Sequence, residues 1–160
     1  MTIDGQTGRV TPPGAPGSLH RRFNACPDAI RVVLAQAQAW MLACGLSAIL
    51  RAEAELVLAE VLNNIAEHAY ASDCGPVDLR LRRCGDGILC LISDRGSAMP
   101  GDDLPKGASP MASTSRIARD DLPEGGFGWH LIRLLARDLR YRRNRDRNRL
   151  AFVLDAGNWR

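Results

Sequence analysis

Several features that would assign a chain to a familiar class are missing from this 160-residue sequence. None of its five cysteines belongs to a C-x-x-C pair, which argues against a structural zinc site. No stretch approaches the roughly 20 apolar residues that span a bilayer, and no signal peptide is recognisable, so we expect a protein of the reducing cytoplasm and no membrane partner. The net charge of +3 is too small to require a polyanionic partner.

The composition suits one compact domain. A chain of 160 residues with 46% hydrophobic residues can bury roughly two-thirds of its unfolded surface around a single core. Residues 1–18 are rich in Gly, Pro and Thr without apolar periodicity, which predicts a disordered leader. We therefore expect one domain over residues 19–157, without internal repeats.

Helical periodicity follows a first strand that begins at Leu19. Asp28 is predicted to cap a first helix that stops at Gly45, and Ser47 is predicted to cap a second one. A third helix begins in the glycine-rich segment near residue 126 and keeps an apolar period as far as Leu139.

Alternating and continuous apolar runs predict the remaining strands. Residues 76–83 alternate apolar and charged side chains, as in a half-buried strand, and a turn at 85–87 leads into a buried strand over 88–92. Residues 139–143 and 148–154 predict a terminal hairpin.

Glu60, Asn64 and His68 recur at four-residue intervals in the second helix. On an α-helix such positions drift by only about 40° per step, so the three side chains share one face. An Asn carbonyl oxygen suits Mg²⁺, and a Glu one turn away can orient or deprotonate a nucleophile. The alternative is an ordinary solvated helix face.

Two glycine-containing segments add to this pattern. Asp94 follows the buried strand and could accept a hydrogen bond from a base amino group, while Gly96 would let a flat ring approach the backbone. The alternative for this segment is an ordinary turn. Gly125, Gly126 and Gly128 lead into a helix start whose free N–H groups would form a phosphate cradle. This second segment is no dinucleotide-fold fingerprint, because the glycine spacing and the preceding strand are missing.

In this order and spacing, the three segments resemble the ATP-binding domain of the gyrase, heat-shock chaperone, histidine kinase and MutL superfamily. Within it the resemblance is strongest to the small anti-sigma factor serine/threonine kinases, whose helix reads Glu-x-x-x-Asn-x-x-x-His-Ala-Tyr. The resemblance covers roughly residues 19–155. It implies an α/β two-layer sandwich of the Bergerat type, with three helices on one face of a mixed, mainly antiparallel sheet.

The resemblance also implies roles for individual residues. Glu60 would be the general base, Asn64 the Mg²⁺ ligand, and Asp94 the reader of the adenine amino group. Residues 97–123 would form a nucleotide lid. The remaining nucleotide contacts would come from His68, Gly96, Met99, Gly125, Gly126, Phe127 and Gly128. His68 has a second interpretation, as a capping group at the helix C-terminus.

By resemblance, the protein would use ATP and Mg²⁺ to phosphorylate a serine or threonine of a small antagonist protein, and it would sequester a sigma factor. The resemblance leaves a homodimer open. Phe127 and Trp129 depart from the small or aliphatic residues usual in such kinases, and the final strand lacks the Thr that many relatives place near the base.

Two other functions are compatible with the sequence. The chain could be a non-catalytic ATP-binding interaction module. It could also be a basic nucleic-acid-binding domain, because eight arginines cluster between residues 133 and 149. We favour a solvated edge or a docking face for this cluster, since Asp138 and Asp146 interrupt it and no aromatic stacking pattern accompanies it.

Overall fold

The computed structural model describes residues 17–71, 73–99, 104 and 126–155. Its strands are β1 (Ser18–Asn24), β2 (Pro76–Cys84), β3 (Gly87–Asp94), β4 (Arg137–Asn144) and β5 (Arg147–Leu154). Its helices are α1 (Pro27–Ala43), α2 (Ala48–Asn64), the π-helical turn η1 (Ile65–Ala69) and α3 (Gly126–Leu135).

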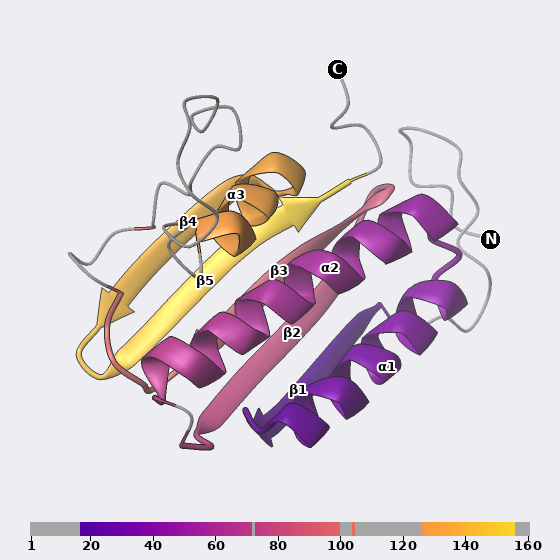
Figure 1. The fold of residues 1–160 in the computed structure, drawn as a ribbon. Coiled ribbons are helices and arrows are strands. Elements are labelled where there is room, and N and C mark those ends of the chain that lie inside the picture. Colours follow the sequence, from indigo (N-terminus) through magenta and orange to yellow (C-terminus); the bar gives the residue numbers. More distant parts are fainter. Residues whose placement is uncertain (1–16, 72, 100–103, 105–125, 156–160) are drawn as a thin grey trace, which may run out of the picture.

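The described strands form one sheet in the order β1-β2-β3-β5-β4. The three α-helices lie side by side on one face of this sheet, in the order α1, α2, α3 (Figure 1). The predicted two-layer α/β sandwich is confirmed. The expected mixed sheet is wrong, because all four neighbouring strand pairs are antiparallel. The second strand of the β4–β5 hairpin, β5, pairs with β3 and runs in the opposite direction. The sheet therefore stays antiparallel across this junction.

The hydrophobic core fills the space between the sheet and the helices. Alternate side chains of β2, β3 and β5 point to the helices, as the period of a strand requires. Complete burial of a large aliphatic or aromatic side chain contributes about 1.5–3 kcal/mol. The largest such side chains include Met41, Leu50, Leu58, Leu62, Leu79, Leu81, Ile88, Ile92 and Phe152.

The predicted helix boundaries are largely confirmed in the first half of the chain. Ser47 Oγ accepts a 3.2 Å hydrogen bond from the amide three residues on, as an N-cap residue does. Gly45, at φ +70°, follows the end of α1. The predicted cap at Asp28 is wrong: Cys26 is the N-cap residue, without a side-chain cap bond. Pro27 occupies the first helical position, where its missing N–H leaves no bond unmade.

The predicted site helix is not one continuous α-helix. Glu60 and Asn64 lie in α2, but His68 lies in η1, where the Tyr70 amide donates to the Ile65 carbonyl, five residues back. π-Helical turns are rare in proteins, and those that occur are often found at functional sites. The third helix also ends earlier than predicted, so that Leu139 lies in β4.

Two predicted segments fall largely outside the described residues. Of the leader at 1–18, only residues 17 and 18 are described, and Ser18 already belongs to β1. Of the lid at 97–123, residues 97–99 and 104 are described. None of the described helices combines the length and the apolar character needed to cross a membrane.

A disulfide between Cys26 and Cys74 joins the start of α1 to the loop before β2. Next to it, the Ala25 amide donates a 2.8 Å hydrogen bond to the Gly75 carbonyl. Nothing in the cysteine spacing pointed to this pair, whose members are 48 residues apart in sequence. The disulfide therefore fastens the loop after η1 to the edge of the sheet.

We expect Cys74→Ser to lower the free energy of unfolding by roughly 2–4 kcal/mol under oxidising conditions, because the disulfide restricts the unfolded chain. Urea unfolding measures this change. Cys84→Ser is the matched control, since Cys84 is exposed and free. Reduction should bring the unmutated protein to the stability of Cys74→Ser, and an unchanged urea midpoint after reduction would show that the disulfide contributes nothing.

Candidate functional site

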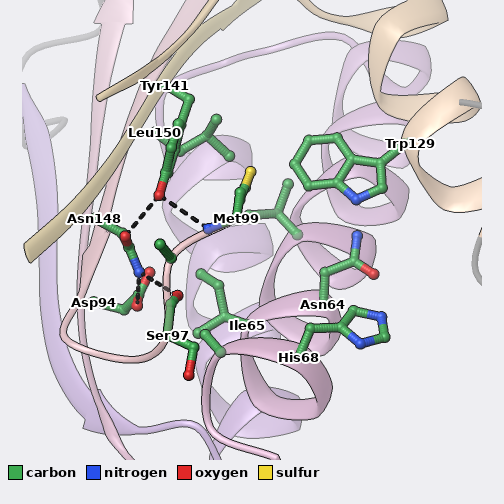
Figure 2. Close-up of a pocket in the computed structure, with 13 residues that line it drawn as sticks. Asn64, Ile65, His68, Asp94, Ser97, Met99, Trp129, Tyr141, Asn148 and Leu150 are labelled. Carbon is green, nitrogen blue, oxygen red and sulfur yellow. Dashed lines mark hydrogen bonds between the residues drawn. The ribbon is translucent and has the colours of Figure 1, made fainter. Parts of the chain in front are cut away.

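A cavity of about 370 Å³ lies between the α2–η1 helix, the segment after β3, the start of α3 and the β4–β5 hairpin. Four residues predicted for the site line it: Asn64, His68, Asp94 and Met99. In Figure 2, Asp94 lies on one side of the cavity, whereas Asn64 and His68 lie on the opposite side, on the helix. These four residues come from two of the three sequence segments, and Trp129 of the third segment also lines the cavity.

Asp94 is buried at the end of β3, with a relative exposure of only 6%. Its Oδ1 atom accepts hydrogen bonds from the Gly96 amide at 2.9 Å and from Asn148 Nδ2 at 2.8 Å. Burial raises the pKa of this carboxyl group, while these two bonds and the Arg143 guanidinium oppose the rise. Both bonds use Oδ1, so Oδ2 is the oxygen that they leave for a ligand.

Gly96 does not line the cavity, but it lets η1 come close to the segment after β3. A Cβ at Gly96 would overlap the carbonyl group and the side chain of Ala69. Beside this contact, the Ser97 amide donates a 2.8 Å hydrogen bond to the Ala69 carbonyl. This carbonyl lies at the end of the helix, where no amide of the helix is available to donate to it. The glycine is therefore required here for contact between two protein segments.

Asn64 has a buried side-chain nitrogen, Nδ2, without a hydrogen-bond partner. Leaving such a donor unsatisfied costs about 1–3 kcal/mol, so an unpaired amide in a cavity indicates a place for a polar ligand. His68, one turn further along the helix, is exposed at the rim of the cavity.

Glu60 lies directly beside the start of α3. A Cβ at Gly128 would overlap Glu60 Oε2, and it would come within 3.8 Å of Asn64 Nδ2. The backbone of the second glycine segment therefore faces both polar side chains of α2. Gly126 is the first residue of α3, and Gly125 lies outside the described residues.

The two aromatic residues of the second glycine segment have different environments. Trp129 is buried, with 7% exposure, and lines the cavity, whereas Phe127 is 49% exposed and does not line it. Phe127 was predicted as a nucleotide contact, and Trp129 was not. The spacing of Trp129, Ile132 and Leu135 on the inner face of α3 was the signal that could have identified it.

Three polar lining residues were also missed: Ser97 after β3, Tyr141 in β4 and Asn148 in β5. Tyr141 and Asn148 occupy the alternate positions of their strands that face the helices. That alternation is visible in the sequence. The pairing of Asp94 with Asn148 across β3 and β5 is not, because it depends on the register of strands far apart in the chain.

The two ends of the site have different chemistry. Around Asp94, the walls include the apolar side chains of Ile65, Met99 and Leu150, which suit a flat ring that offers a hydrogen-bond donor to the carboxylate. Around Glu60 and Asn64, the start of α3 supplies the positive end of a helix dipole, which suits an anion.

The family model described as the histidine kinase-like ATPase domain matches residues 23–154. Serine-protein kinase RsbW of Bacillus cereus is 26% identical over 85 residues, which cover 53% of this chain and 52% of that protein. The protein of the same name from Bacillus thuringiensis subsp. konkukian gives the same values. The chain thus matches about half the length of these curated relatives.

A solved structure with a similar fold contains the RsbU and RsbW domains of Rv1364c from Mycobacterium tuberculosis. The TM-score is 0.60 at 19% identity, and the alignment covers 88% of this chain and 32% of that one. At this identity the likeness supports the fold alone.

We expect Gly128→Ala and Glu60→Ala to be non-additive in stability. Alanine favours a helix over glycine by about 0.5–1 kcal/mol, but the new methyl group displaces the Glu60 carboxylate. The gain from Gly128→Ala should therefore be larger in the Glu60→Ala background than in the unmutated protein, and urea unfolding of the four proteins measures the difference. Equal gains in both backgrounds would mean that Glu60 does not contact the start of α3.

Proposed function

Because the chain belongs to the histidine kinase-like ATPase domain family, we propose that it binds ATP with Mg²⁺ in this cavity and transfers the terminal phosphoryl group to a protein serine or threonine. The observation that carries the proposal is the arrangement of Glu60, Asn64 and Gly128, where a carboxylate, an unpaired amide and a helix start meet. These are the groups that a nucleotide phosphate and an attacking hydroxyl require.

The adenine ring would occupy the end of the cavity at Asp94. Its exocyclic amino group would donate to Asp94 Oδ2, since the two protein bonds occupy Oδ1. Guanine carries a carbonyl oxygen at that ring position and would face the carboxylate with a second acceptor. This difference would make ATP the preferred nucleotide.

Mg²⁺ fits the donor set at the other end. Turning the Asn64 carboxamide over would exchange its unpaired nitrogen for a carbonyl oxygen, a ligand that this cation accepts. Asn64 would then hold the ion, with the other ligands from phosphate oxygens and water. When bound, Mg²⁺ would neutralise negative charge on the phosphates.

In the transfer step, Glu60 would take the proton from the attacking hydroxyl group. The hydroxyl oxygen would form a bond to the terminal phosphorus as the bond from phosphorus to the bridging oxygen breaks, and ADP would leave with that electron pair. The backbone amides at the start of α3 would stabilise charge on the transferred group.

As the acceptor we propose a small antagonist protein, with a sigma factor as the competing partner, as in the kinases that the motifs resemble. The RsbW proteins are named serine-protein kinases, which supports the acceptor residue. We also infer a cytoplasmic location for such a switch. There the Cys26–Cys74 disulfide would be exposed to thiol reductants.

The first test of the proposal concerns Asn64. Asn64→Ala should abolish the dependence of ATP affinity on Mg²⁺, because it removes the only protein ligand assigned to the ion. Titration calorimetry with and without Mg²⁺ measures this. Asn63→Ala is the matched control, since Asn63 is the neighbouring amide and is exposed. Equal ATP affinity of the unmutated protein with and without Mg²⁺ would contradict the assignment.

The second test concerns catalysis. Glu60→Gln keeps the size of the side chain but removes the base, so it should slow transfer by roughly 10²–10⁴ while ATP affinity changes little. Labelled ATP and the small antagonist domains encoded in the same genome provide the assay.

The exposed Glu67, in η1, provides the matched control Glu67→Gln. If the unmutated protein binds ATP yet labels none of these antagonists, the kinase function is wrong and the chain is a nucleotide-binding interaction module.

A further inference from the structure

Asp94 and Asn148 are the only buried polar residues among those that the structure describes, with exposures of 6% and 5%. They face each other across β3 and β5. A buried carboxylate is expensive unless it is hydrogen-bonded, and Asn148 supplies one of its two bonds.

The side-chain amide of Asn148 has no bonding capacity left for a ligand. Its nitrogen donates to Asp94 Oδ1 at 2.8 Å and to the Ser97 carbonyl at 2.9 Å. Its oxygen accepts from the Tyr141 hydroxyl at 2.7 Å and from Arg143 Nη1 at 2.6 Å. A carboxamide has two N–H donors and two acceptor lone pairs, so all four are used.

Tyr141 and Arg143 also hold the segment that follows Asp94. The Tyr141 hydroxyl accepts from the Met99 amide at 3.2 Å, and Arg143 Nη1 donates to the Gly96 carbonyl at 3.0 Å. Figure 2 shows the chain of bonds from Met99 through Tyr141 and Asn148 to Asp94 and Ser97 on one wall of the cavity. Arg143 thus points inward, unlike the solvated edge expected for the arginine cluster.

We propose that Asn148 is a positioning residue for base recognition: held by Tyr141 and Arg143, it fixes Asp94 through Oδ1 so that Oδ2 faces the amino group of the base. The inference rests on the proposed ATP-binding function. It gives a role near the base to a residue of the final strand, which lacks the Thr that many relatives place there. Selectivity for adenine then depends on a residue whose side chain has no hydrogen bond left to make with the nucleotide.

Asn148→Asp separates this role from a purely structural one. The introduced carboxyl group has nearly the same shape but places a second acid beside Asp94, and the pKa of one member of such a pair rises strongly. At low pH the pair shares a proton, and the introduced group can still donate to Asp94. As the pH rises both ionise, the donor is lost, and the carboxylates repel each other.

The pH dependence of ATP binding should therefore reverse. The charged or titratable groups around Asp94 include Arg143 in β4, Tyr70 after η1 and, across the cavity, His68. Outside the cavity, Asp94 lies beside a second hollow that is also lined by Arg22, Asp78, Arg95 and Arg147. None of these groups changes between the unmutated protein and Asn148→Asp. In the unmutated protein, ATP affinity should fall as the pH decreases through the raised pKa of Asp94. In Asn148→Asp it should fall as the pH increases, by about 10–100-fold at pH 8, the effect of losing one charge-assisted bond.

The experiment measures ATP and GTP affinity by calorimetry at several values between about pH 5.5 and about pH 8. Affinities are expressed relative to the unmutated protein, so that protonation of the nucleotide itself cancels. Asn144→Asp is the matched control, because it makes the same change at an exposed position of the same hairpin. It should follow the unmutated protein at every pH. Asn148→Asp should lose affinity with rising pH and lose preference for ATP over GTP.

The outcomes separate this inference from the proposed function. If the unmutated protein binds no nucleotide, both are wrong. If it binds ATP and Asn148→Asp has the same affinity, selectivity and pH profile, or loses affinity for ATP and GTP equally at every pH, Asn148 is only structural and the inference alone is wrong.

If circular dichroism shows that Asn148→Asp does not fold, Tyr141→Phe tests the inference instead. It removes only the hydroxyl group that holds Asn148 and Met99, and it should lower ATP affinity about 3–10-fold, the effect of one neutral hydrogen bond, with a smaller ratio of ATP to GTP affinity. An unchanged ratio would overturn the inference.

Discussion

The site depends on two close contacts that glycines make with the α2–η1 helix. Gly96 meets Ala69, and Gly128 meets Glu60. A Cβ at either position would overlap the helix, so the segment after β3 and the start of α3 could not both approach it as closely. The distance between the Asp94 end and the Glu60 end of the site follows from these two contacts, because each fixes one end to the same helix.

The Asp94 end of the site is held by the sheet. Asp94 lies in the last position of β3, and its cross-strand partner Asn148 lies in β5. The neighbouring strand β4 supplies Tyr141 and Arg143, which donate hydrogen bonds to Asn148. The cost of burying a carboxylate is offset by two hydrogen bonds and by a nearby guanidinium. Every donor and acceptor of the Asn148 amide is used, so the Asp94 carboxylate that it holds has little freedom to turn. A fixed acceptor discriminates between ligands better than a mobile one.

The sequence predicted the parts of this arrangement that depend on local spacing. The four-residue interval from Glu60 to Asn64, the acid at a strand end and the glycines at a helix start are all local patterns, and the strand alternation predicted the sheet. The disulfide, the π-helical turn and the Asn148 contacts could not be predicted in the same way. The disulfide depends on the meeting of Cys74 with Cys26, and the Asn148 contacts depend on the pairing of β5 with β3. The π-helical turn has no local sequence pattern that marks it, and its end contacts the distant segment after β3 through the Ala69 carbonyl and the Ser97 amide.

The two ends of the site are built on different elements, so the proposed nucleotide binding and the proposed phosphoryl transfer could be lost separately. Adenine recognition would rest on β3, β4 and β5, whose hydrogen-bonded strands keep Asp94 in place. Phosphoryl transfer would rest on Glu60 in α2 and on the first turn of α3, which meet by side-chain and backbone contact alone. A small shift of α3 would separate its first turn from Glu60 while leaving the surroundings of Asp94 intact. A chain of this design could therefore keep the proposed nucleotide binding after losing the proposed phosphoryl transfer, because catalysis would place the stricter demand on its geometry.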